Sequence, residues 1–296
     1  MGQKIVVAGA TGHLGSLVVK ALAKYNAEVV ALVRPGTDES RLSPLRVENV
    51  TVTEVSLAEA KDLQQALRGA ACVISTLQGL QNVIRDDQTA LLDAAVSAGV
   101  SRFIPSDFAL DFTKLVPGTN RNLDLRRDFH GVLRSRPIQA TSILNGAFST
   151  ILTTPGVMVN FNDKQMNYWQ NPDQEMDFTT LENVAQFTAA AALDASAPRV
   201  LRIAGGVASA REIAQILGEV TGDGFSLNRL GSLDDLAGYT AKVRESAPED
   251  GKVFPQWSGM QYLHNMFGGE GKLVPLDNDR YAGIDWTGVK AILAAR

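Results

Sequence analysis

The segment Lys4–Leu22 constrains the fold more than any other part of the sequence, because three glycines join an apolar run to an amphipathic one. Ile5-Val6-Val7-Ala8 predicts a short buried strand, and apolar residues recur at helical spacing from Leu14 onward. The glycines are spaced three residues apart: Gly9, Gly12 and Gly15. Glycine permits a tight turn and close backbone approach, and a helix that begins there directs free N–H groups at an anion. The segment therefore predicts a phosphate-binding loop; the alternative is that the glycines serve helix–strand packing alone.

Strand-like and helix-like segments alternate through the first half of the chain. Predicted strands are 4–8, 28–33, 51–55, 71–76, 101–105 and 139–144, and predicted helices are 14–25, 58–68, 83–98 and 122–135. This alternation predicts an α/β fold with a Rossmann-type doubly wound parallel sheet. The regularity weakens after residue 150. We expect a Rossmann domain over residues 1–150, with later contributions from about 177–206, and a smaller C-terminal substrate lobe interleaved with it over 151–296.

Composition excludes several classes of protein. The net charge of −4 and the lack of a Lys/Arg run argue against a nucleic-acid partner. The chain has a single cysteine, Cys72, which rules out an internal disulfide and a multi-cysteine metal site, and no metal is expected. Cys72 lies in an apolar run and is predicted to be a core residue. No apolar run reaches the roughly 18 residues of a membrane span, and no signal peptide precedes the first strand. We therefore expect a cytoplasmic protein without a membrane partner.

The second predicted strand ends in Arg34, at the place where sites that prefer NAD carry an acidic residue for the ribose hydroxyl. A guanidinium pairs well with a 2′-phosphate, so Arg34 favours NADP(H), and Arg41 can add a second positive contact. A surface arginine at a strand end is the alternative. Polar residues that follow later strands should line the same edge of the sheet. The predicted cofactor-binding residues are Gly9, Thr11, Gly12, His13, Leu14, Gly15, Arg34, Thr76, Ser106 and Asn145.

Several segments resemble the NmrA-like and isoflavone-reductase-like branch of the atypical short-chain dehydrogenases/reductases. They include "VVAGATGHLG", "CVISTL", "RFIPSDF" and "MDFTTLENVAQFTAAAALD", and the resemblance covers nearly the whole chain. It implies a Rossmann domain with a smaller lobe, NADP(H) binding and, in many members, reduction of phenolic or quinone substrates. Other members bind the nucleotide as regulators.

The chain departs from that branch in the groups that handle a proton. Ordinary short-chain dehydrogenases carry Tyr-x-x-x-Lys, which is absent here. Plant reductases of the branch instead carry a lysine in the helix after the Pro-Ser-Glu/Asp-Phe motif. This chain has no lysine between Lys114 and Lys164. The corresponding helix offers Arg126, Arg127, Asp128 and His130 instead. Ser56 also replaces an aspartate that the group often has near the adenine.

His264 is the predicted catalytic residue, because the plant enzymes have a histidine in a similar segment and histidine transfers protons near neutral pH. The alternative is a histidine packed within the lobe. His130 is expected to be solvated on a polar helix. Aromatic side chains are predicted either to wall a substrate pocket or to belong to the core: Tyr168, Trp169, Trp257, Tyr262 and Phe267.

These expectations combine into an NADPH-dependent reductase of a small aromatic, quinone-like or enone/carbonyl substrate. The alternative is a non-catalytic NADP(H)-sensing regulatory protein, which the missing Tyr/Lys pair favours. Monomer and homodimer are both open.

Overall fold

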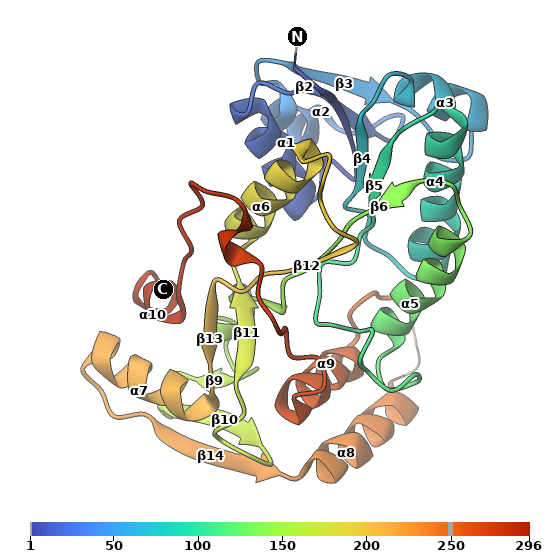
Figure 1. Cartoon of the computed structure of the whole chain (residues 1–296). Coiled ribbons are helices and arrows are strands. Elements are labelled where there is room, and N and C mark those ends of the chain that lie inside the picture. Colours follow the sequence, from blue (N-terminus) through green and yellow to red (C-terminus); the bar gives the residue numbers. More distant parts are fainter. Residues whose placement is uncertain (1, 248–250) are drawn as a thin grey trace.

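The computed structural model describes residues 2–247 and 251–296. Six parallel strands form the central sheet in the order β3-β2-β1-β4-β5-β6 (Figure 1). They are β1 (Lys4–Ala8), β2 (Glu28–Val33), β3 (Val50–Glu54), β4 (Cys72–Ser75), β5 (Arg102–Ile104) and β6 (Gln139–Ala140). The chain order reverses between β1 and β4, which defines a doubly wound Rossmann sheet. The predicted α/β class is confirmed.

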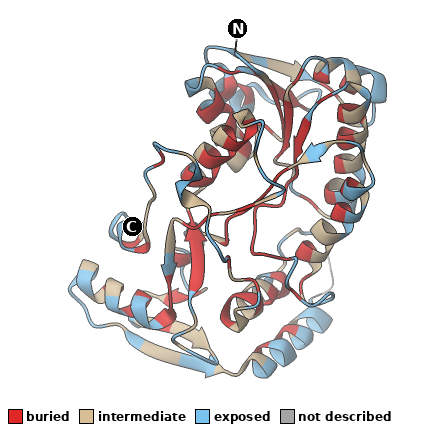
Figure 2. Ribbon diagram, viewed as in Figure 1, coloured by how far each residue is buried: buried red, intermediate tan, exposed pale blue. Residues whose placement is uncertain are grey.

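Helices cover both faces of this sheet. On one face α1 (His13–Lys24) packs against α6 (Leu181–Leu193), while α3 (Ala60–Leu67), α4 (Gln88–Ser97) and α5 (Arg121–Arg134) cover the other (Figure 1). The helix expected over 83–98 is instead a π-helical turn, Asn82–Asp87, followed by α4. A short α2 (Glu39–Leu42) and a 3₁₀ turn follow β2. Buried residues run through the sheet and the inner helix faces (Figure 2).

One apolar cluster unites elements that are far apart in the sequence. Val184 and Phe187 of α6 pack with Ile5 of β1 and Val18 of α1. Cys72 lies in the same cluster, fully buried as predicted, and burial raises the pKa of its thiol to about 12. The first sheet strands and α6 therefore share one core.

The segment expected to be a single strand over 139–144 is divided between two sheets. Its first part, β6, pairs with β5, and its second part, β7 (Ser142–Leu144), pairs with β12 (Val200–Arg202). The change occurs at Thr141: its N–H donates to the Phe103 carbonyl, whereas the Ser142 N–H donates to the Arg199 carbonyl. The strand leaves the central sheet because its hydrogen-bond partner changes at that point.

The remaining elements form the smaller lobe. Its strands form two three-stranded sheets, β14-β10-β9 and β13-β11-β8 (Figure 1). The strands are β8 (Ala147–Phe148), β9 (Val159–Asn160), β10 (Gln165–Trp169), β11 (Met176–Thr179), β13 (Gly206–Ala208) and β14 (Ser226–Gly231). The helices are α7 (Ala210–Thr221), α8 (Leu233–Ser246), α9 (Gln256–Gly268) and α10 (Val289–Ala294). Within the described ranges, no helix is both long enough and apolar enough to span a membrane.

Local sequence signals explain where the helices of the lobe begin and end. The Thr180 side chain accepts the Asn183 N–H at the start of α6. Ser209 and Glu212 form a reciprocal capping box at the start of α7, and Gly222 ends that helix with φ of 76°. All three features are local, because each residue acts within a few positions of itself.

Candidate active site

Two of the three glycines are required by packing. A Cβ on Gly15 would lie 2.2 Å from the Gly9 carbonyl oxygen, and a Cβ on Gly9 would lie 2.8 Å from the Thr76 hydroxyl. Gly9 also has a positive φ of 79°. Gly12 differs, because an added Cβ there would meet only the Gly9 carbonyl oxygen, at 3.2 Å. The packing alternative thus accounts for Gly9 and Gly15 and leaves Gly12 at the open side of the loop.

The amino end of α1 is left without a side-chain cap. Gly12 is the N-cap residue, no side chain accepts its first N–H groups, and no acidic residue lies in the first turn. Side chains of Asn120, Thr180, Ser209 and Ser232 cap α5, α6, α7 and α8, whereas α3, α4, α9 and α10 have no side-chain cap either. The free N–H groups and the positive end of the helix dipole make this an anion-binding position. Of the predicted loop residues, His13 is exposed and Leu14 is half-buried.

Two arginines stand beside this loop. Arg34 directly follows β2 and is exposed. Its charge lowers the pKa of Asp87, but burial and the charge of Asp86 have larger effects, so that pKa is raised overall. Arg41 reaches the loop itself, and its Nη2 donates to the hydroxyl and the carbonyl oxygen of Thr11, at 3.2 and 3.4 Å. The loop and the end of β2 therefore present two guanidinium groups near the uncapped helix.

The predicted hydroxyl residues at the carboxyl edge hold neighbouring loops together. The Thr76 hydroxyl donates to the Ala8 carbonyl at 2.9 Å, and so supports the glycine loop. The Ser106 hydroxyl donates to the Leu77 carbonyl at 2.7 Å, and its backbone N–H donates to Gln88 Oε1. Both hydroxyl protons are thus engaged by backbone oxygens.

The prediction that His130 is solvated is wrong. His130 is only 6% exposed, and its Nε2 lies 2.6 Å from Asp107 Oδ2, which is fully buried just beyond β5. Ser142 Oγ lies 3.4 Å from the same nitrogen, and Phe112 packs edge-on against the ring. The signal that was missed is the seven-residue spacing from the buried Leu123, which puts His130 on the inner face of α5.

Polar atoms without partners collect at this edge. Three of the residues lie at or just after strand ends: Ser75 ends β4, Asp107 follows β5, and Asn145 follows β7. Each has one buried side-chain oxygen that makes no hydrogen bond to any described residue. Arg126 Nε, one helical turn before His130 on α5, is also buried and unpaired within the described ranges. Buried polar groups without partners are rare and mark places where a ligand or water completes the site.

His264 lies on α9, which is fixed to the start of α5. Gln261 Oε1 accepts the Arg121 N–H, and Asn265 Oδ1 accepts the Asn120 side-chain amide, both at 3.1 Å. His264 itself is half-buried and makes no hydrogen bond or ion pair with the parts of the chain that the structure describes. Its imidazole is therefore not committed to holding the lobe together.

The aromatic residues of the lobe occupy different environments. Trp257 is fully buried, with the Arg121 and Arg244 guanidinium groups 4.7 and 4.6 Å from its ring, so it walls no open pocket. Phe267 belongs to the core. The three other predicted wall residues are half-buried: Tyr168, Trp169 and Tyr262. Among residues 2–247 and 251–296, no group of three His, Cys, Asp or Glu side chains is placed to hold a metal ion.

Comparison with known proteins places this architecture in a family. A fungal NmrA-like family domain-containing oxidoreductase from Gibberella moniliformis is 26% identical over 262 residues, covering 83% of this chain and 86% of the relative. An isoflavone reductase homolog from Zea mays is 40% identical over 115 residues, 37% of this chain and 36% of the relative. The solved structure of AtPrR2 with NADP⁺ and (+)pinoresinol superposes with a TM-score of 0.84 at 18% identity, covering 100% of this chain and 99% of that one. Residues 1–246 match the NmrA-like family, and the chain belongs to that family.

Proposed function

We propose that this protein is an NADPH-dependent reductase of a small aromatic, quinone-like or enone/carbonyl substrate. The observation that carries the proposal is the uncapped amino end of α1 after the glycine loop, with Arg41 of α2 hydrogen-bonded to Thr11 of that loop and Arg34 at the end of β2. This combination of free N–H groups and two cations suits a dinucleotide that bears an extra phosphate. The named activities of the fungal and plant relatives support the reaction class.

Each part of the site has a separate task in this proposal. The N–H groups at the start of α1 hold the pyrophosphate, and the Arg34 and Arg41 guanidinium groups hold the 2′-phosphate. Gly12 leaves the backbone accessible, while Gly9, Gly15 and Thr76 fix the shape of the loop. The nucleotide, when bound, would supply a hydride, and Ser106 and Asn145 would line its site at the carboxyl edge of the sheet.

The substrate needs a donor for the negative charge that develops on its oxygen. We assign this task to His264, which lies on the lobe and has no competing partner. His130 is a second candidate, but its Nε2 is already engaged by Asp107. A His130 variant that lost turnover while the His264 variant kept it would reverse this assignment.

Turnover of NADPH with a panel of carbonyls, quinones and enones tests the proposal. We expect at least one substrate class to be reduced in proportion to the NADPH consumed. Tight NADPH binding without turnover on the whole panel would contradict a reductase and favour the nucleotide-sensing alternative. In that case NADP⁺ and NADPH should differ in their effect on binding of a partner protein.

A further inference from the structure

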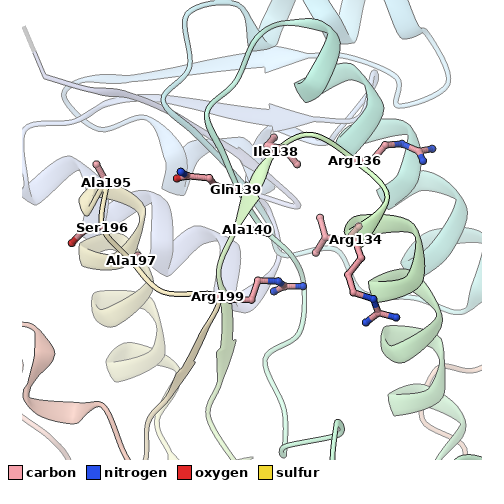
Figure 3. Close-up of a pocket in the computed structure, with 10 residues that line it drawn as sticks. Arg134, Arg136, Ile138, Gln139, Ala140, Ala195, Ser196, Ala197 and Arg199 are labelled. Atoms are coloured by element: carbon pink, nitrogen blue, oxygen red, sulfur yellow. The ribbon is translucent and has the colours of Figure 1, made fainter.

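A pocket lies away from the nucleotide edge. It is formed by the end of α5, the amino ends of β6 and β12 and the loop that precedes β12, with a volume of about 460 Å³ (Figure 3). Three arginines line it, Arg134, Arg136 and Arg199, together with the apolar side chains of Leu133 and Ile138. The glycine loop follows the carboxyl end of β1, so this pocket opens at the opposite edge of the sheet.

The three arginines are not equally neutralised. Arg136 forms a two-point ion pair with Asp93, at 2.6 and 3.3 Å, and points away from the other two (Figure 3). Arg199 extends toward α5, where Arg134 lies, and its Nη1 donates to the Ser142 hydroxyl at 2.7 Å. Neither Arg134 nor Arg199 has an ion-pair partner within the described part of the chain.

Arg134 and Arg199 are both exposed residues, and the charge of Arg134 acts on Arg199. Burial lowers the pKa of Arg199, the carboxylate of Asp107 opposes that shift, and the like charge of Arg134 adds to it. Asp107 already pairs with His130, at 2.6 Å. Arginine does not give up its proton in proteins, so both guanidinium groups remain charged at the pocket. An anion between them would remove the repulsion and accept hydrogen bonds from both.

We propose that this pocket binds a small organic anion, whose carboxylate or phosphate group is held by Arg134 and Arg199 and whose apolar part rests on Leu133 and Ile138. A guanidinium matches either oxyanion through paired N–H donors. The volume is within the range of small-molecule sites. The site is separate from the nucleotide loop, so it does not depend on the proposed reductase activity.

Isothermal titration with benzoate, phenyl phosphate and the neutral benzyl alcohol tests the site on the full chain. We expect both anions to bind and benzyl alcohol not to bind. Arg134→Gln and Arg199→Gln should each weaken anion binding by at least about tenfold, because each removes a charged donor. Arg136→Gln is the matched control and should leave binding within about twofold, because Arg136 is paired with Asp93.

Circular dichroism melting of each variant shows that it is folded, and binding is compared at one ionic strength. Tighter binding of phenyl phosphate identifies a phosphate ligand, and tighter binding of benzoate a carboxylate; either order supports the site. The proposal is overturned if neither anion binds, if benzyl alcohol binds equally well, or if folded Arg134→Gln and Arg199→Gln proteins bind like the wild type. Equal weakening by all three substitutions also overturns it, since that indicates only a general charge effect.

Discussion

Gly15→Ala tests how closely the glycine loop is packed. The added Cβ would lie 2.2 Å from the Gly9 carbonyl oxygen and 2.6 Å from the Thr76 hydroxyl, so the backbone of the loop has to move. Overpacking of this kind costs about 1–3 kcal/mol, and alanine returns up to ~1 kcal/mol through its helix propensity. The expected net loss is about 1–2 kcal/mol, which lowers the Tm of a chain of this size by roughly 2–3 °C.

Gly238→Ala is the control for that prediction. Gly238 is exposed in the interior of α8, and an added Cβ would meet nothing within 4 Å. The substitution should therefore raise stability by up to ~1 kcal/mol. Thermal unfolding followed by circular dichroism measures both effects, and fluorescence titration measures NADPH affinity. We expect NADPH binding to weaken by about tenfold in Gly15→Ala and to be unchanged in Gly238→Ala. If Gly15→Ala melted at or above the wild-type Tm with normal NADPH affinity, the close approach of Gly15 to Gly9 would be refuted.

Three further predictions concern other parts of the molecule. Arg34→Ala should weaken NADPH binding by at least about tenfold and leave NADH binding nearly unchanged, since only NADPH carries the 2′-phosphate; equal losses would remove the specificity argument. His264→Ala should lower turnover about 100-fold with NADPH affinity retained, and unchanged turnover would leave His264 a packing residue. Asp111 is buried, which raises its pKa, but hydrogen bonds from Thr113 and Arg202 and the Arg202 charge hold that pKa below its usual value. The Asp111 carboxylate therefore stabilises the fold above about pH 4, and this contribution is lost as the pH falls through the lower folded-state pKa. The free energy of unfolding in urea should fall less steeply with decreasing pH in Asp111→Asn than in the wild type. The same pH dependence in both proteins would contradict the assignment.

The parts of the fold that the sequence predicted depend on local signals. The strand Ile5–Ala8 and the capping residues Thr180 and Ser209 act within a few residues of themselves, so their patterns can be interpreted without knowing the tertiary structure. The parallel arrangement of the central strands follows from the repeated strand–helix alternation, because parallel neighbours require crossover connections.

The errors share a different origin. The division of 139–144 between two sheets depends on β12, about 60 residues later, which no local pattern reveals. The spacing from Leu123 could have revealed that His130 is buried, but its carboxylate partner, 23 residues away, could not be inferred from the sequence. Apolar periodicity carries no information about such long-range polar contacts. Nucleotide-binding roles for the glycine loop and Arg34 could be proposed from short motifs, whereas the environment of His264 depends on how α9 is fixed to α5.

The core shared by α6 and the first sheet strands determines what happens if the backbone is cut. A break in the exposed turn around Asn171 and Asp173 separates β1 and α1 from the helix that covers them. Each fragment then lacks half of the same apolar interior: Ile5 and Val18 lose Phe187, and Phe187 loses them. Neither piece is a self-sufficient folding unit, yet their surfaces are complementary. The two halves should consequently reassociate when mixed, and a protein nicked at this turn should keep its shape and unfold in one transition.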